Sequence, residues 1–156
     1  MNSNGHTLLN FVNGQWQRSS ASAALDVMNP ATAQVLTHVP LSPGAEINAA
    51  VEAGQRAFEL WRRIPVTERI QYLFRLKNLL EENLDDIART ITNECGKTYG
   101  ESAAEMRRAI ENVEVACGAP ILMQGVNNED IAAGIDEHMI RQPLGVVACI
   151  TPFNFP

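Results

Sequence analysis

Apolar residues recur at three- and four-residue spacing through most of residues 42–117, and this pattern limits the possible folds more than any other feature of the chain. Such spacing places apolar side chains on one face of an α-helix. The first face comprises Ile47, Ala50, Val51, Gly54, Phe58 and Trp61. The second run starts at Thr67 and comprises Ile70, Leu73, Phe74, Leu80, Leu84, Ile87, Ala88 and Ile91; the third comprises Met106, Ile110, Val113 and Cys117. We therefore expect three amphipathic helices whose apolar faces are buried.

Residues with capping preferences stand at the ends of these runs. Ser42 is expected to cap the first helix, with Pro43 at its first position. Asn83 can divide the second run in two and cap residues 84–95, and Gly96 can end it in the left-handed conformation. Thr98–Glu101 matches a capping box and predicts the start of the third helix.

Short strands are predicted before the helices. Phe11–Gln17 is typical of a hairpin, because Asn13-Gly14 forms a two-residue turn in which both positions tolerate positive φ. Leu25–Pro30 and Gln34–Val39 predict a second pair of strands.

Beyond the helices, residues 125–136 show neither a helical nor a strand period, whereas Glu137–Gln142 predicts a strand. Val146–Ile150 is a compact apolar run, typical of a buried strand in a parallel sheet. Together with the helices, this run predicts an α/β fold.

The chain then ends in Thr151-Pro-Phe-Asn-Phe-Pro156. Pro152 and Pro156 cannot donate backbone hydrogen bonds, so they end any regular strand. In open α/β sheets, ligands bind beyond the carboxyl ends of the strands. The amide of Asn154 could there donate to a developing oxyanion, which stabilises a transition state by roughly 3–4 kcal/mol. The alternative is that Asn154 only serves a turn.

Ile150–Pro156 resembles the segment of aldehyde dehydrogenases that carries the oxyanion asparagine and passes beside the nicotinamide cofactor. Phe153 stands where many members have tryptophan. This phenylalanine, the helix Glu105–Glu114 and the run Cys117–Pro120 resemble the CoA-acylating methylmalonate-semialdehyde dehydrogenases. The resemblance extends from about Phe11 to the last residue and corresponds to only the first third of such an enzyme.

The resemblance implies an arrangement of three segments in an aldehyde-dehydrogenase-like amino-terminal part. Residues 1–136 would form the amino-terminal β-hairpins and three amphipathic helices. These helices would be the helical layer of the cofactor-binding domain. Residues 137–145 would form an oligomerisation-type strand and turn. Residues 146–156 would form the first strand and catalytic loop of a Rossmann-type dinucleotide-binding sheet. The full-length protein is expected to be a homo-oligomer, a dimer or a tetramer.

The resemblance also implies a reaction. The full-length enzyme would oxidise methylmalonate or malonate semialdehyde with NAD, form a thioester on a cysteine, pass the acyl group to CoA and release carbon dioxide. Asn154 would hold the oxyanion, and Thr151 and Phe153 would contribute to the NAD site.

Arg108 matches the position that grips the substrate carboxylate in the semialdehyde enzymes. A guanidinium suits this role, because it offers a forked pair of donors to a planar carboxylate. The alternative is a surface ion pair with Glu101, Glu105 or Glu111, all at helix-compatible spacing.

Much of the catalytic machinery is missing from this sequence. Cys95, Cys117 and Cys149 are interpreted as small hydrophobic residues on apolar patterns, since no histidine or acid is placed nearby to activate a thiolate. No later glutamate base or glycine-bearing cofactor loop is present, so we expect the 156-residue chain alone to be inactive. Two alternatives remain: a semialdehyde dehydrogenase that hydrolyses its acyl intermediate, such as a succinate-semialdehyde enzyme, and a non-catalytic helical interaction module.

Composition excludes several other classes. The net charge of −6 and the lack of a Lys/Arg cluster argue against nucleic acid as a partner. The resemblance implies a small-molecule semialdehyde substrate instead. No apolar run approaches the roughly 18 residues of a membrane span. The histidines show no metal-ligand spacing, so no metal is expected. The amino terminus shows neither the basic start nor the apolar core of a secretory signal, and a cytoplasmic protein is expected.

Overall fold

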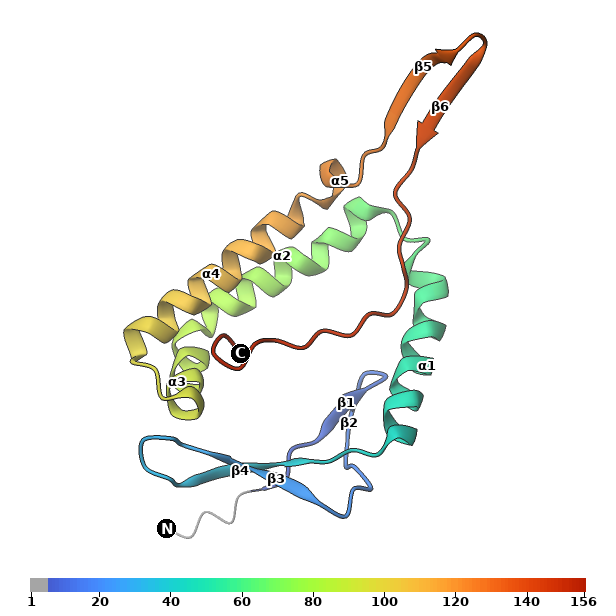
Figure 1. The fold of residues 1–156 in the computed structure, drawn as a ribbon. Coiled ribbons are helices and arrows are strands. Elements are labelled where there is room, and N and C mark those ends of the chain that lie inside the picture. The colour runs from blue at the N-terminus through green and yellow to red at the C-terminus, as the bar shows by residue number, and fades with distance from the viewer. Residues whose placement is uncertain (1–5) are drawn as a thin grey trace.

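A computed structural model describes residues 6–156 and shows an α/β arrangement of helices and antiparallel strand pairs (Figure 1). The first strands are β1 (Asn10–Val12), β2 (Gln15–Gln17), β3 (Ala24–Met28) and β4 (Val35–Pro40). The helices are α1 (Gly44–Trp61), α2 (Val66–Glu82), α3 (Leu84–Cys95), α4 (Tyr99–Cys117) and the short α5 (Ala119–Leu122), and β5 (Val126–Ala132) and β6 (Ile135–Met139) follow them. The predicted α/β class is confirmed, and the described residues contain four long helices because the second predicted run is divided at Asn83.

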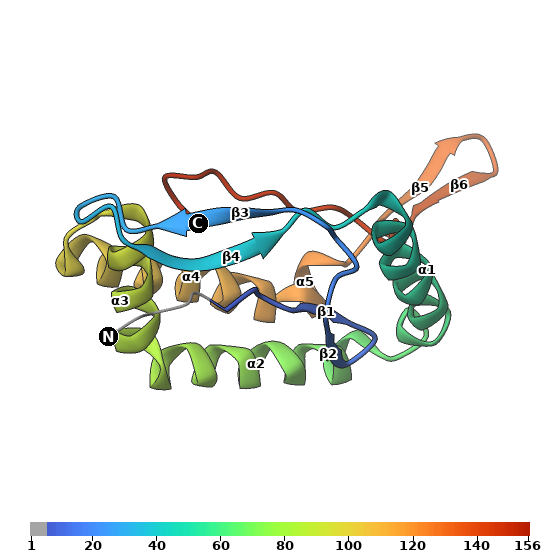
Figure 2. The same ribbon diagram turned by 90° about the horizontal axis from the view of Figure 1, so that it is seen from below.

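The core lies where α2 and α3 pack against α4, an arrangement that we call the α2–α4 layer. Its buried side chains are Ala88, Ile91, Ala103 and Met106, with Leu80, Leu84, Ile87 and Cys95 packed around them. All of them except Ala103 and Cys95 belong to the second and third predicted apolar faces, so the helical period located most of this core. In both views α1 stands apart from this layer (Figures 1 and 2).

The predicted ends of the α2–α4 layer are largely confirmed. Asn83 separates α2 from α3, although its side chain donates to the Leu79 carbonyl at 2.8 Å and does not cap α3. Gly96 ends α3 with a φ of +77°, in the left-handed region that favours glycine. Thr98 and Glu101 form the predicted capping box at the start of α4.

The prediction for the start of α1 is wrong by one residue. Pro43, not Ser42, is the residue that precedes the helix, and no side chain caps it. The Ser42 hydroxyl instead accepts a hydrogen bond from Asn10 at 2.8 Å, because the β1–β2 hairpin approaches this end of the helix.

The two amino-terminal strand pairs are confirmed. β1 and β2 pair antiparallel around Asn13 and Gly14, which have φ angles of +53° and +76°. β3 pairs antiparallel with β4.

The prediction that residues 125–136 lack regular structure is wrong. β5 occupies most of this stretch and pairs antiparallel with β6, which begins two residues before the predicted strand Glu137–Gln142. Every side chain of both strands is exposed, so their sequences carry no alternation of buried and exposed residues from which pairing could be predicted.

Two predicted buried surfaces are exposed in this chain. Val146–Ile150 is not a strand of a parallel sheet; it runs as an irregular segment, and the Ile150 side chain is 88% exposed. The apolar face of α1 is only partly covered: Ala50, Gly54 and Phe58 are half-buried, whereas Ile47 is 58% exposed. A buried strand of a parallel sheet needs neighbouring strands on its edges, and no strand within residues 6–156 pairs with Val146–Ile150. Within the described part of the chain, the predicted start of a Rossmann-type sheet is therefore not formed.

None of the helices within residues 6–156 combines the length and the hydropathy needed to cross a lipid bilayer.

Candidate functional site

The terminal loop, Thr151–Pro156, closes as a tight turn in which the Phe155 N–H donates to the Pro152 carbonyl at 2.9 Å. Phe153 and Asn154 occupy the centre of this turn. The turn is closed by backbone atoms alone, and among residues 6–156 no group forms a hydrogen bond with the side-chain amide of Asn154. The amide is therefore free to act on a ligand.

A cluster between α3 and α4 holds this loop, and we call it the loop anchor: Cys95, Lys97 and Glu105. The Lys97 ammonium group donates to both the Asn154 carbonyl and the Glu105 carboxylate, and it lies 4.3 Å from the centroid of the Phe155 ring. The Cys95 sulfur lies 3.8 Å from the Phe153 carbonyl oxygen. In Figure 1 the terminal segment accordingly ends beside α3.

Local sequence signals place Lys97. It follows Gly96, the left-handed end of α3, and precedes Thr98, the cap of α4. The Thr98 hydroxyl and backbone N–H both donate to Glu101, which lowers the pKa of that carboxyl group. Lys97 thus stands between two well-defined helix ends, and its side chain is only 21% exposed.

Arg108 is on α4, one turn beyond Glu105. Its guanidinium donates to the Glu111 carboxylate at 2.6 Å, and its side chain is 79% exposed. The structure thus contains the surface ion pair that was the alternative to the carboxylate clamp. No hydrogen bond or ion pair joins Arg108 to the terminal loop within the described residues. Because an exposed pair contributes only about 0–1 kcal/mol, opening it for another carboxylate costs little.

The side chains of Thr151 and Phe153 are both exposed. They lie in the same loop as Asn154, so the structure brings three of the four predicted site residues together and leaves Arg108 on a separate helix face.

The cysteines have different environments. Burial and a hydrogen bond with Glu94 raise the pKa of the Cys95 thiol to about 11, which disfavours the nucleophilic thiolate. Cys117 is buried in the core, whereas Cys149, which was predicted within a buried strand, is exposed. No group of three or more His, Cys, Asp or Glu side chains that could hold a metal ion is found in residues 6–156.

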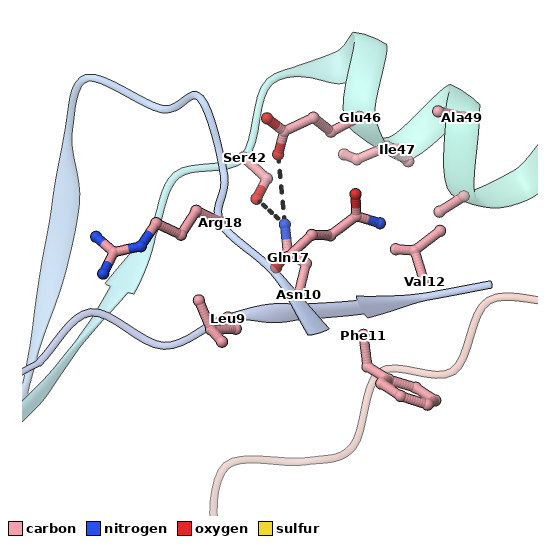
Figure 3. A pocket seen from close by; sticks show the side chains of 11 residues that line it. Leu9, Asn10, Phe11, Val12, Gln17, Arg18, Ser42, Glu46, Ile47 and Ala49 are labelled. Carbon is pink, nitrogen blue, oxygen red and sulfur yellow. Dashed lines mark hydrogen bonds between the residues drawn. The ribbon is translucent and has the colours of Figure 1, made fainter. Parts of the chain in front are cut away.

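A pocket of about 460 Å³ lies between the β1–β2 hairpin and the start of α1, and none of the predicted site residues lines it (Figure 3). Its most connected side chain is Glu46, whose carboxylate accepts hydrogen bonds from Asn10, Ser19 and Ser20. Hydrogen bonds from the Ser20 backbone N–H and hydroxyl, and then from the Ser19 hydroxyl, lower the pKa of Glu46 to about 2. The pocket therefore marks a structural junction that ties the amino-terminal strands to α1.

Sequence reasoning missed Lys97, Glu105 and Glu46. The sequence Gly96-Lys97-Thr98 could have drawn attention to Lys97, because the backbone of a residue between two well-defined helix ends is held in one position. No sequence signal pairs Lys97 with the terminal loop, since the two are far apart along the chain.

A model of the aldehyde dehydrogenase family matches residues 16–156. The chain belongs to the aldehyde dehydrogenase family. It is 50% identical over 150 residues to malonate-semialdehyde dehydrogenase 2 of Geobacillus thermodenitrificans and 51% identical over 150 residues to malonate-semialdehyde dehydrogenase 3 of Geobacillus kaustophilus. Each alignment covers 96% of this chain and 31% of the relative, so the chain spans less than a third of the length of these relatives.

Solved aldehyde dehydrogenases share the fold. The methylmalonate-semialdehyde dehydrogenase of Oceanimonas doudoroffii superposes with a TM-score of 0.90 at 41% identity, over 96% of this chain and 30% of that one. A Sinorhizobium meliloti protein assigned as a methylmalonate-semialdehyde dehydrogenase, solved with NAD, gives 0.92 at 32% identity, over 99% and 31%. The succinate-semialdehyde dehydrogenase of Burkholderia pseudomallei gives 0.88 at 33% identity, over 96% and 31%. The predicted family, and the predicted match to the first third of its members, are confirmed.

Proposed function

We propose that the full-length protein oxidises malonate or methylmalonate semialdehyde with NAD and converts it to an acyl-CoA with loss of carbon dioxide. The observation that carries this proposal is the identity of about half of the residues, over nearly the whole chain, with malonate-semialdehyde dehydrogenases. The proposed substrate is therefore a small aldehyde that also bears a carboxylate.

The proposed reaction balances without a further reagent. Malonate semialdehyde, CoA and NAD⁺ give acetyl-CoA, carbon dioxide and NADH. The aldehyde hydrogen leaves as hydride to NAD⁺, the thiol sulfur of CoA takes the acyl carbon, and the carboxylate leaves as carbon dioxide. The CoA thiol proton ends on the methyl carbon.

Within this chain, Asn154 is proposed to donate its amide to the oxyanion that forms when a thiolate attacks the aldehyde. The support is geometric: the amide has no partner within the described residues, while its backbone is fixed by the loop anchor. Preorganised donors of this kind stabilise developing charge most effectively, because they do not reorganise during the reaction.

Thr151 and Phe153 are proposed to contact NAD, which would accept the hydride beside this loop. Their exposure next to Asn154 supports this role, as does the NAD-bound neighbour from Sinorhizobium meliloti. Arg108 is proposed to exchange Glu111 for the substrate carboxylate. Both ligands are carboxylates: Glu111 accepts from one N–H of the guanidinium, which can offer two parallel donors to a substrate carboxylate.

The 156-residue chain alone is proposed to be inactive, and CoA is proposed as a co-substrate of the full-length protein. The apolar face of α1 and the Val146–Ile150 segment are proposed to be covered by the rest of that protein. Both regions expose large apolar side chains, such as Ile47 and Ile150, and contiguous apolar surface of this kind marks interaction sites. We retain the three segments 1–136, 137–145 and 146–156 as proposed divisions, together with homo-oligomerisation and a cytoplasmic location.

A non-acylating semialdehyde dehydrogenase is the second candidate, favoured by the structural likeness to the Burkholderia pseudomallei succinate-semialdehyde dehydrogenase. The isolated chain could also serve as a helical binding module, since the α2–α4 layer has a core of its own. Binding of NAD by the full-length protein separates the enzyme candidates from the module.

Product analysis separates the two enzymes. The full-length protein is incubated with malonate semialdehyde, NAD and CoA, and the products are identified by mass spectrometry. We expect acetyl-CoA in equal amount to NADH. Malonate as the free acid, formed at the same rate with and without CoA, would contradict the proposal and favour the second candidate.

A further inference from the structure

We infer that Lys97 is a positioning residue for Asn154 and that Glu105 holds Lys97 in place. The inference rests on the proposed role of Asn154 as the oxyanion donor. Lys97 lies outside the terminal loop. Its ammonium group contacts the backbone carbonyl of Asn154 and not the side-chain amide that is proposed to act on the substrate.

The Lys97 ammonium group has three partners: the backbone of Asn154, the carboxylate of Glu105 and the ring of Phe155. It donates to the Asn154 carbonyl and to the Glu105 carboxylate, and it lies 4.3 Å from the Phe155 ring centroid. A lysine ammonium group has three N–H donors and no acceptor, so this set of partners suits it fully. The Phe155 contact is at cation–π distance.

These contacts act where the loop has little other support. Phe153, Asn154 and Phe155 are exposed, and the turn has a single backbone hydrogen bond of its own. The direction of the Asn154 amide follows from the orientation of its backbone. Lys97 therefore limits rotation of the turn, because it holds both the Asn154 carbonyl and the Phe155 ring.

Burial explains why Glu105 is needed. The Lys97 and Glu105 side chains are only 21% and 12% exposed, so water stabilises these charges less than it stabilises surface charges. Without Glu105 the ammonium group would be partly desolvated and unpaired, and it would turn towards solvent and release the loop.

The test is a double-mutant cycle in the full-length protein, with kcat and KM measured separately. We expect Lys97→Met to lower kcat roughly 10- to 100-fold, because displacements of about 1 Å in a reacting group have effects of this size. The KM for the semialdehyde should change little. Combined with Asn154→Ala, Lys97→Met should cause no further loss, since its effect passes through that amide.

Lys77→Met is the matched control. Lys77 is 22% exposed and pairs with Glu81 and Glu114, so this change also removes a half-buried lysine from carboxylate partners, but it lies on α2 and has no bond to the terminal loop. We expect kcat of this variant to equal that of the unchanged protein. An equal loss in both lysine variants would show a general effect on stability and overturn the inference.

The outcomes separate this inference from the proposed function. If Asn154→Ala retains full activity, the role of Asn154 fails and the inference fails with it. If Asn154→Ala is impaired while Lys97→Met is unaffected, or the two losses multiply, only the inference is overturned. If Lys97→Met does not fold, Glu105→Gln, which keeps the side-chain size, takes its place in the same cycle with the same expected non-additivity.

Discussion

The α2–α4 layer and the α1 helix carry equally clear apolar patterns, yet only the first buries them. In the layer, Ile91 is 8% exposed and Ala88 and Met106 are buried. On α1 no residue is buried. A helical period therefore shows which face of a helix is apolar, but whether that face is covered depends on a second element at the right place.

The presence or absence of a packing partner also distinguishes the terminal loop from Val146–Ile150, the segment that precedes it and was predicted to be a strand. The loop has the helix ends of α3 and α4 beside it and is anchored there. Val146–Ile150 has no strand beside it in residues 6–156, and it stays irregular. Helices satisfy their backbone hydrogen bonds internally, whereas a strand requires a neighbour.

The largest expected effect on stability comes from comparing two isoleucines, Ile91 in the α2–α4 layer and Ile47 on α1. In the 156-residue chain, Ile91→Ala should destabilise the fold by about 2–5 kcal/mol, because it removes a buried side chain and leaves a cavity. Ile47→Ala on α1 should change stability by no more than about 0.5 kcal/mol. Chemical denaturation followed by circular dichroism measures both. Equal losses would mean that the α1 face is covered in solution.

Two glycines test the helix ends. Gly96→Ala should cost about 1–2 kcal/mol for the left-handed backbone alone. It should cost more in practice, since the new β-carbon would lie 2.8 Å from Cγ of Pro30. At Gly44, the first residue of α1, a new β-carbon would meet no atom of residues 6–156 within 4 Å, so Gly44→Ala should leave the midpoint of denaturation nearly unchanged. If both variants unfold at the same denaturant concentration, the importance of the Gly96 junction is refuted.

The capping box should show a smaller effect. Thr98→Ala removes the hydroxyl that accepts from the Glu101 N–H, and we expect a loss of about 1 kcal/mol. Thr67→Ala, at an exposed position near the start of α2, is the control and should have little effect. Thermal unfolding measures both, and an unchanged Thr98→Ala midpoint would argue against the capping box.

The smallest expected effect is on the thermal stability of the chain at acidic pH. Since the pKa of Glu46 is lowered from 4.5 to about 2 in the folded chain, its ionised form stabilises the fold above pH 4.5, and this contribution is lost as the pH falls towards 2. Glu46→Gln cannot show this loss. We expect the thermal midpoint of the unchanged chain to fall more steeply than that of Glu46→Gln over this interval. Parallel pH profiles would contradict the lowered pKa.

Local signals in the sequence predicted much of the fold. Asn13-Gly14, Gly96 and the Thr98–Glu101 box each determine a short stretch of backbone, and each was found as predicted. Predictions that depended on distant partners were wrong: the buried α1 face, the Val146–Ile150 strand and the irregular 125–136 segment. Burial and strand pairing are set by residues that are not neighbours in sequence.

The candidate site divides in the same way. The proposed site residues Asn154, Thr151 and Phe153 form one short motif, so the sequence alone could place them together, and the structure has them in one loop. The contacts of Lys97 and Glu105 could not be predicted, because Lys97 meets Asn154 only where the α3–α4 junction meets the end of the chain.

One paired assay tests the central claim, that this chain supplies the Asn154 loop of a semialdehyde dehydrogenase and needs the rest of the protein for activity. NADH formation from malonate semialdehyde, NAD and CoA is followed at equal concentrations of the full-length protein and the 156-residue chain. We expect NADH from the full-length protein and none above background from the chain alone. Turnover by the chain alone, or no turnover by either, would contradict the claim.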